Sequence, residues 1–292
     1  MLGSGVRPTR CQHSGGCSRY STATTMRGSS TTRGAAAERE AVVLVGDVHG
    51  QLAKLESLWT ELEKELGTER FENRTLVVFL GDLVDRGPDT AGVLSFIAGI
   101  PERYPDMDVR VLCGNHDFAM GTFLGLIHIE GGDAPLGFHN GRRAEPPLWE
   151  DGTGAARHVG MHLHGRRWGA FCDDDGRGAT NAFASHETFA SYGVTPGDLN
   201  GLLAAMPPCH KRLLASLEFV VEVDEGVTDD EFPEVRRLIA VHAGLECDDV
   251  SVEQQLVALR ARKVDRQWLE PLQGRSNCIG LPPPVLWDGV VG

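Results

Sequence analysis

Several features are scarce or missing in this sequence of 292 residues, and each absence excludes a class of protein. It contains no run of about 18 consecutive apolar residues, so it predicts a soluble protein that does not cross or bind a membrane. Basic residues number 28 against 41 acidic ones, and the net charge of −13 argues against a nucleic-acid partner bound through a general basic surface. The seven cysteines include no CxxC pair, which favours a reducing compartment over a disulfide scaffold.

The first 37 residues contain no aspartate or glutamate. They hold five arginines among many Ser, Thr and Gly residues, which is the composition of an organellar transit peptide. We expect residues 1–37 to be a disordered tail or a transit peptide for chloroplast or mitochondrion. The alternative is an unstructured tail without an address, on a cytoplasmic protein. Residues 38–292 are long enough for one catalytic domain with a substantial core.

Short β-branched runs alternate with amphipathic segments in the first half of this domain. The pattern predicts strands at Ala41–Val45, Leu76–Leu80 and Asp108–Cys113, with helices at Gln51–Leu66 and Pro88–Ile100 between them. Continuous apolar strands of this length are typical of a sheet buried on both faces. The order of elements therefore predicts an α/β protein with a mainly parallel sheet.

The second half predicts a further pair of strands and a long insertion. Glu218–Val223 and Arg237–His242 are expected to pair antiparallel around an acidic loop. About 120 residues separate GNHD at 114–117 from VHAGL at 241–245, which is too many for a simple loop, and we assign residues 118–210 to an insertion that selects the substrate. Helices are predicted within it at Met120–Ile129 and from Thr195 to Met206.

Four polar strings carry the chemistry. They are GDVHG at residues 46–50, GDLVDRG at 81–87, GNHD at 114–117 and VHAGL at 241–245. Each of the first three begins where a predicted strand stops, and ligands gather at the carboxyl ends of parallel strands. The strings should therefore meet at one edge of the sheet.

These residue types suit a centre with two divalent cations. Asp47 and His49 can hold one metal, Asp82 can bridge it to a second, and Asn115 with His242 can complete the second site. Carboxylates mixed with imidazoles favour manganese, iron or zinc. Two cations about 3.5 to 4 Å apart can share a water, lower its pKa and direct the resulting hydroxide at phosphorus.

Other motif residues can serve acid catalysis and phosphate binding. His116 is a candidate acid that protonates the leaving oxygen, and by strand alternation it should point away from the metal ligands. Asp85 can accept the second ring proton of His116 and fix its tautomer. Arg86 offers a planar fork to phosphate oxygens, and Asn115 is a second candidate for contacting the substrate phosphate.

The four strings resemble those of the calcineurin-like metallophosphoesterases, and within them the phosphoprotein phosphatase branch, whose pattern is GDxHG, GDxVDRG, GNH[DE] and H[AG]G. The resemblance covers roughly residues 42–275 and implies a four-layer α/β/β/α sandwich with mixed sheets. It also implies the metal, acid and phosphate-binding roles named above. GNHD, HAGL and the segment Phe189–Gly193 are more similar to the bacterial-type branch, which includes Shewanella-like protein phosphatases and diadenosine tetraphosphatases.

The resemblance implies a metal-dependent phosphoesterase that hydrolyses phosphomonoesters, with phosphorylated proteins or small phosphoesters as substrates. The expected activity is that of a protein serine/threonine phosphatase; hydrolysis of diadenosine polyphosphates is the first alternative. The family has a further histidine ligand after another strand, and this sequence contains no histidine beyond His242. Since Val290-Val291 reads as the start of that strand, we expect a truncated sequence, with a divergent enzyme as the alternative. An inactive phosphate-binding scaffold is the second functional alternative.

Overall fold

The computed structural model describes most of the predicted catalytic domain. The described residues are 39–127, 168–169, 183–224, 237–246, 251–262 and 271–273, together with three short strands at 23–28, 227–228 and 290–291. Most of the predicted tail, and most of the insertion between residues 127 and 183, lie outside the described residues. Among the described residues, no helix combines the length and the apolar composition needed to cross a membrane.

The larger sheet has five strands in the order β4-β3-β2-β1-β6. Its parallel part consists of β2 (Ala41–Val45), β3 (Thr75–Phe79) and β4 (Asp108–Val111), with Val43 opposite Val77 and Val77 opposite Val109. The three strands predicted from β-branched runs are confirmed, with ends that differ by at most two residues.

Strand β1 (Ala23–Gly28) pairs antiparallel with β2, and β6 (Val227–Thr228) pairs antiparallel with β1. These strands make the larger sheet mixed. The position of β1 departs from the prediction of a wholly unstructured tail, because six of those 37 residues extend the sheet. The targeting role of the tail stays a prediction.

The smaller sheet has the order β5-β7-β8. As predicted, β5 (Val221–Asp224) and β7 (Arg237–Ala240) run antiparallel, with Val221 opposite Ala240. Strand β8 (Val290–Val291) pairs parallel with β7, which confirms the strand expected at these residues.

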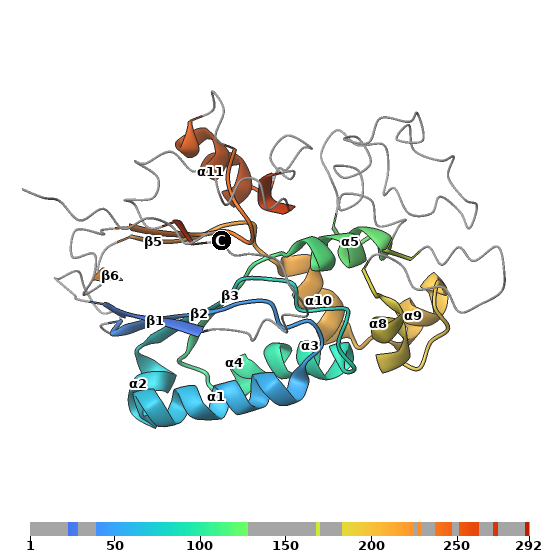
Figure 1. Ribbon diagram of the computed structural model, residues 1–292, viewed down its shortest axis with the longest axis horizontal. Coiled ribbons are helices and arrows are strands. Elements are labelled where there is room, and N and C mark those ends of the chain that lie inside the picture. The colour runs from blue at the N-terminus through green and yellow to red at the C-terminus, as the bar shows by residue number, and fades with distance from the viewer. Residues whose placement is uncertain are drawn as a thin grey trace, which may run out of the picture.

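The two sheets and the helices form four layers (Figure 1). Helices α1, α2, α3 and α4 cover the outer face of the larger sheet, the smaller sheet lies against its other face, and α11 covers the smaller sheet. This is the α/β/β/α arrangement expected above. The helices are α1 (Leu52–Leu66), α2 (Thr68–Asn73), α3 (Thr90–Ala98), α4 (Ile100–Arg103), α5 (Asn115–Phe123), α8 (His186–Ser191), α9 (Leu199–Ala205), α10 (Pro208–Ser216) and α11 (Val252–Arg260), with one 3-10 turn at Pro271–Gln273.

Three helices begin elsewhere than the apolar periodicity indicates, and in two of them a side-chain cap decides where the helix starts. Helix α3 begins at Thr90 rather than Pro88, since the Asp89 carboxylate accepts from the amide of Gly92 at 2.7 Å. Helix α9 begins after Asp198 for the same reason. Helix α5 begins at Asn115, five residues before the predicted start at Met120, and therefore contains most of the GNHD string.

Side chains alternate between two cores along the parallel strands. Val43, Val45 and Val77 face the helices, where Trp59 packs in T-shaped contact with Phe71 at a ring separation of 5.1 Å. The neighbouring residues of the same strands face the smaller sheet in a second cluster, made of Val42, Leu44, Leu76, Val78, Leu80, Leu112, Val221, Val223, Leu238 and Ala240. Burial on both faces holds the parallel strands rigidly, so the loops at their carboxyl ends have a fixed base.

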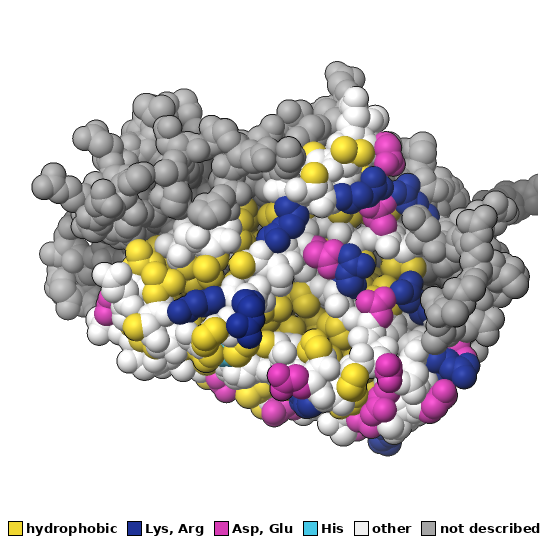
Figure 2. Space-filling model, turned by 180° about the vertical axis from the view of Figure 1, so that it is seen from behind, with side chains coloured by type: hydrophobic (Ala, Val, Ile, Leu, Met, Phe, Trp, Pro, Cys, Tyr) yellow, Lys and Arg dark blue, Asp and Glu magenta, His cyan; other side chains and the backbone are white. Residues whose placement is uncertain are grey.

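The surface is finely mixed in charge. Among the described residues seen in Figure 2, basic and acidic side chains lie interspersed between hydrophobic ones. One such cluster links three elements: Glu222 of β5 accepts from both Arg260 of α11 and Arg237 of β7. The ion pair between Arg260 and Glu222 therefore joins α11 to the smaller sheet.

Candidate functional site

The four polar strings converge at one edge of the sandwich. GDVHG follows β2, GDLVDRG follows β3 and GNHD follows β4, while His242 lies two residues beyond β7. The loops are hydrogen-bonded to one another, since the amides of Val48 and His49 both donate to the carbonyl of Asp82, at 3.1 and 2.8 Å. The fold therefore brings the predicted site residues together.

The backbone at these loops is held in an uncommon conformation. His49, Asp82, Asp85 and Arg86 have φ values of 43°, 51°, 71° and 64°. Positive φ in residues with a Cβ costs about 1 kcal/mol or more each, and it clusters at functional sites where the surroundings enforce it. Close packing between the loops holds these positive φ values in place. The loops are so close that a Cβ on Gly81 would lie 2.4 Å from the amide nitrogen of Gly114.

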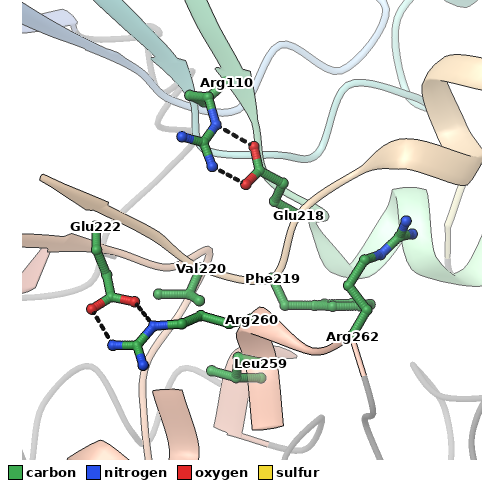
Figure 3. A pocket seen from close by; sticks show the side chains of 8 residues that line it. All are labelled: Arg110, Glu218, Phe219, Val220, Glu222, Leu259, Arg260 and Arg262. Atoms are coloured by element: carbon green, nitrogen blue, oxygen red, sulfur yellow. Dashed lines mark hydrogen bonds and ion pairs between the residues drawn. The ribbon is translucent and has the colours of Figure 1, made fainter. Parts of the chain in front are cut away.

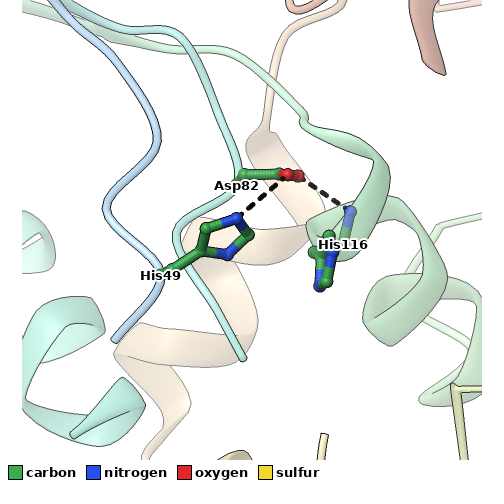
Figure 4. Close-up of side chains that lie close together, drawn as sticks. All are labelled: His49, Asp82 and His116. Carbon is green, nitrogen blue, oxygen red and sulfur yellow. Dashed lines mark hydrogen bonds and ion pairs between the residues drawn. The ribbon is translucent and has the colours of Figure 1, made fainter. Parts of the chain in front are cut away.

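Asp82 is the centre of the candidate metal site (Figure 4). Its side chain is almost fully buried, and in Figure 4 its carboxylate lies between the imidazole of His49 and the backbone amide of His116, which donates to Oδ1 at 2.9 Å. His49 Nε2 lies 3.5 Å from Oδ2, and His242 Nε2 lies 3.5 Å from Oδ1. Ligand atoms bound to one cation at about 2.0 to 2.2 Å lie roughly 3 to 3.5 Å apart. The spacing thus fits one cation on each side of a bridging carboxylate.

Both imidazoles are held in the tautomer that a metal ligand needs. Nδ1 of His49 lies 2.9 Å from the carbonyl oxygen of Val84, and Nδ1 of His242 lies 2.8 Å from that of Leu80. A carbonyl only accepts, so each Nδ1 carries the proton and donates. In the neutral rings, each Nε2 therefore carries the lone pair that a cation needs. Such backbone support is typical of histidines that bind metals.

Asn115 and Asp47 complete the donor set. The Oδ1 atom of Asn115 lies 3.1 Å from His242 Nε2, so an oxygen and a nitrogen that can both bind a cation lie next to each other. Asp47 Oδ2 lies 3.7 Å from His49 Nε2, on the exposed side of the cluster. Oxygen and nitrogen donors without thiolate suit manganese, iron or zinc. The residues present thus fit a pair of divalent cations.

The charges of the cluster support ionised Asp82 and neutral His49. Burial opposes ionisation of Asp82, but the neighbouring His242, His116 and His49 and the amide of His116 together lower its pKa. Burial also lowers the pKa of His49, although the charge of Asp82 acts in the opposite direction. A carboxylate with a neutral imidazole is the protonation state that binds cations.

His116 and Asp85 form a buried pair next to this cluster. His116 Nδ1 lies 2.7 Å from Asp85 Oδ2, which is the contact predicted from the sequence. Burial alone would lower the pKa of His116, yet the hydrogen bond to Asp85 and the charges of Asp82 and Asp85 raise it above its ordinary value. The prediction that strand alternation orients His116 is wrong, because His116 lies in the first turn of helix α5.

Arg86 joins the acid pair to the metal cluster. One guanidinium nitrogen lies 2.6 Å from His49 Nε2 and another lies 3.0 Å from His116 Nε2. Arg86 is exposed, so its guanidinium group borders solvent beside the cluster. Of these side chains, those of His49, Asp82 and His116 each offer a ligand atom within 4.8 Å of the others.

Sequence reasoning missed the residues that support this set. The buried carboxylate of Asp117 accepts from the amides of Leu83 and Gly114, both at 2.9 Å, and ties the GDLVDRG loop to the start of α5. Burial and the nearby Asp82 raise the pKa of Asp117 to about 7. Trp168 and Thr188 hydrogen-bond to Asp85 from far along the chain. Only Asp117 carried a signal in the sequence, as the last residue of GNHD.

A separate pocket of about 400 Å³ lies between β4, β5 and α11 (Figure 3). Its apolar lining is formed by Phe219, Val220 and Leu259, and its arginines include Arg110, which pairs with Glu218. None of the predicted site residues lines it.

Comparison with known proteins agrees with the site. Residues 41–199, more than half of the chain, match the family model described as calcineurin-like phosphoesterase. Among curated relatives, a symmetrical bis(5'-nucleosyl)-tetraphosphatase of Legionella pneumophila is 32% identical over 108 residues, 37% of this chain and 33% of that protein. The asymmetrical bis(5'-nucleosyl)-tetraphosphatase PrpE of Oceanobacillus iheyensis is 41% identical over 56 residues, 18% of this chain and 22% of that protein.

A eukaryotic relative shows a similar local likeness. The catalytic subunit of serine/threonine-protein phosphatase 4 of Candida glabrata is 40% identical over 76 residues, 26% of this chain and 22% of that protein. The matched segments thus cover a third or less of each of these three relatives.

Proposed function

The chain belongs to the calcineurin-like phosphoesterase family, and we propose that it hydrolyses phosphomonoesters, with phosphoserine or phosphothreonine in proteins as the substrate. The observation that carries this proposal is the arrangement around Asp82, whose two oxygens each face a histidine Nε2, beside a buried His116–Asp85 pair. The local likeness to serine/threonine-protein phosphatase 4 supports the substrate class.

Five residues would hold the cations: Asp47, His49, Asp82, Asn115 and His242. When bound, two divalent ions supply an activated water and neutralise charge on the phosphate. The ligands themselves are pre-positioned, since the backbone carbonyls of Val84 and Leu80 orient the two imidazoles before any ion arrives. Pre-positioning of this kind reduces the reorganisation needed during the reaction.

Arg86 and His116 act on the substrate. Arg86 donates to both His49 and His116, and the same donors can turn to two oxygens of a phosphate group. That movement frees His116 Nε2 to carry a proton. As the bond between phosphorus and the leaving oxygen breaks, the proton on Nε2 passes to that oxygen, while Asp85 stabilises the charge on the ring through Nδ1–H.

The test is hydrolysis of p-nitrophenyl phosphate and of a phosphoserine peptide by the purified chain with Mn²⁺. We expect Asp82→Asn and His116→Ala to lower peptide hydrolysis by at least about 100-fold, because each removes a group required in the transition state. Asp106→Asn is the matched control, since Asp106 is exposed and lies outside the cluster. Full activity of both site variants would contradict the proposal, and no metal-dependent hydrolysis in any variant would favour a phosphate-binding scaffold.

Hydrolysis of dinucleoside polyphosphates is the second candidate, since two of the relatives are named as bis(5'-nucleosyl)-tetraphosphatases. Diadenosine tetraphosphate has no terminal phosphate, so its cleavage yields nucleotides and no inorganic phosphate in the first step. Measuring kcat/KM for this compound beside the phosphoserine peptide distinguishes the two candidates. A higher value for the dinucleotide would replace the proposed substrate class with this one.

A further inference from the structure

The buried carboxylate of Asp85 is surrounded by hydrogen-bond donors from distant parts of the chain. The side chain is fully buried. Its Oδ2 atom accepts from His116 Nδ1 and from the indole Nε1 of Trp168, both at 2.7 Å. Its Oδ1 atom accepts from the hydroxyl of Thr188, also at 2.7 Å. An ionised carboxylate is stable in such a place only when donors replace the water it has lost.

The direction of these hydrogen bonds follows from the chemistry of the groups. Asp85 as a carboxylate only accepts, so Thr188 must use its single hydroxyl proton toward Oδ1. Thr90 lies 3.0 Å from the Thr188 oxygen and must therefore be the donor in that contact. The amide of Asp85 also donates to Thr188, at 3.1 Å. Thr188 is thus hydrogen-bonded to both the backbone and the side chain of Asp85.

The same region supports the strained turn and the acid itself. The amide of Arg86 donates to the carbonyl of Ala184 at 3.5 Å, next to Asp85 and Arg86 with their positive φ values. The ring of Phe183 meets His116 edge to face, with centroids 5.1 Å apart. These contacts come from residues 168 and 183–188, which lie in the insertion predicted from the sequence to select the substrate.

We propose that Trp168 and Thr188 are positioning residues for the acid His116, acting through Asp85, a proposal that rests on the phosphoesterase function above. The two donors fix the plane of the Asp85 carboxylate, and Asp85 fixes the ring of His116. In their absence Asp85 can rotate, and His116 Nε2 no longer points at the leaving oxygen. The step they serve is the transfer of the Nε2 proton to that oxygen as its bond to phosphorus breaks.

Two substrates with different leaving groups distinguish a loss of acid catalysis from general damage to the protein. General damage would lower kcat for both substrates equally. A p-nitrophenolate leaves readily without a proton, whereas the alkoxide of phosphoserine needs one in the transition state. Trp168→Phe keeps the aromatic ring and removes the N–H, and Thr188→Val keeps the shape and removes the hydroxyl. We expect each to lower kcat for a phosphoserine peptide by about 10- to 100-fold, with KM unchanged and kcat for p-nitrophenyl phosphate nearly unchanged.

Matched controls exist for both substitutions. Trp59 is buried, and its Nε1 has no hydrogen-bond partner among the described residues, so Trp59→Phe changes a core ring without removing a bond. Thr75 is buried and donates to the carbonyl of Arg70, away from the site, so Thr75→Val is the control for the hydroxyl. Neither should alter the ratio of the two activities. Thr188→Ser should restore the ratio, because it returns the donor.

A second measurement needs no activity. The chain has five tryptophans, and the indole N–H signal that Trp168→Phe removes from a ¹H–¹⁵N spectrum is that of Trp168. We expect Asp85→Asn to shift this signal strongly and to leave that of Trp59 in place. An unchanged Trp168 signal in Asp85→Asn, or equal losses on both substrates in Trp168→Phe and Thr188→Val, would overturn the proposal. If His116→Ala also left peptide hydrolysis intact, the proposed function itself would fail.

Discussion

Replacing Gly114 by alanine would disturb Asp82 without removing any metal ligand. Gly114 lies between β4 and α5 with φ −78° and ψ 172°, a conformation that alanine adopts freely. The added Cβ, however, would lie 2.2 Å from the Asp82 amide nitrogen and 2.3 Å from its Oδ1 atom. The substitution is therefore a steric perturbation aimed at the bridging carboxylate.

The size of the effect follows from these distances. Ordinary contact of a Cβ begins at 3.4 Å, so the two loops must separate by about 1 Å. Both neighbouring atoms are buried and belong to backbone or to a short side chain, so neither can rotate away. A displacement of about 1 Å in a catalytic group costs on the order of 100-fold in rate. We expect a loss of that size in kcat/KM, with weaker Mn²⁺ binding.

The assay compares Gly114→Ala with Gly67→Ala in Mn²⁺ titration, hydrolysis of p-nitrophenyl phosphate and urea unfolding. Gly67 has φ 79° and ψ 142°, and nothing lies within 4 Å of its added Cβ, so alanine there strains the backbone by about 1 to 3 kcal/mol without touching the site. The control should lose stability and keep activity. If Gly114→Ala bound metal and turned over like the wild type, the packing of Gly114 against Asp82 would be refuted.

Three further outcomes are expected. Burial alone would raise the pKa of Glu222, but hydrogen bonds from Arg260 and Arg237 lower it. The ionised Glu222 therefore contributes fully to the free energy of unfolding at neutral pH, and this contribution is lost as the pH falls through the lowered pKa. Glu222→Gln should lower the free energy of unfolding, measured with urea, by about 1 to 3 kcal/mol at pH 7 and by less in acid. Leu94→Ala empties a fully buried site of the helix-side core and should lower the free energy of unfolding by about 2 to 5 kcal/mol, with metal binding unchanged. Removing divalent cations with EDTA should abolish hydrolysis and lower the melting temperature, and Mn²⁺ should restore both; full activity in EDTA would exclude a metal mechanism.

The sequence predicted the strands because both of their faces are buried, which leaves a continuous apolar run such as Ala41–Val45. Helix starts were less predictable, because they depend on single carboxylates. Asp89 and Asp198 cap α3 and α9 at positions that apolar periodicity does not mark. The place of β1 in the larger sheet could not be foreseen either, since this strand arises in a segment with a disordered composition.

At the site, the convergence of the metal and acid candidates could be predicted from the strings, because each of the first three strings is local and follows a strand. The supporting contacts could not be read, because they join residues far apart in sequence. Trp168 reaches Asp85 across 83 positions and Thr188 across 103. The backbone carbonyls that orient His49 and His242 carry no sequence signal at all, since every residue has one.

Asp82 would hold two divalent cations together with His49 on one side and His242 on the other. Electron paramagnetic resonance of the protein loaded with two equivalents of Mn²⁺ tests it most directly, since ions about 3.5 to 4 Å apart are magnetically coupled. We predict the spectrum of a coupled pair in the wild type and its loss in Asp82→Asn. The signal of isolated Mn²⁺ ions in the wild type, under conditions of full loading, would contradict the account.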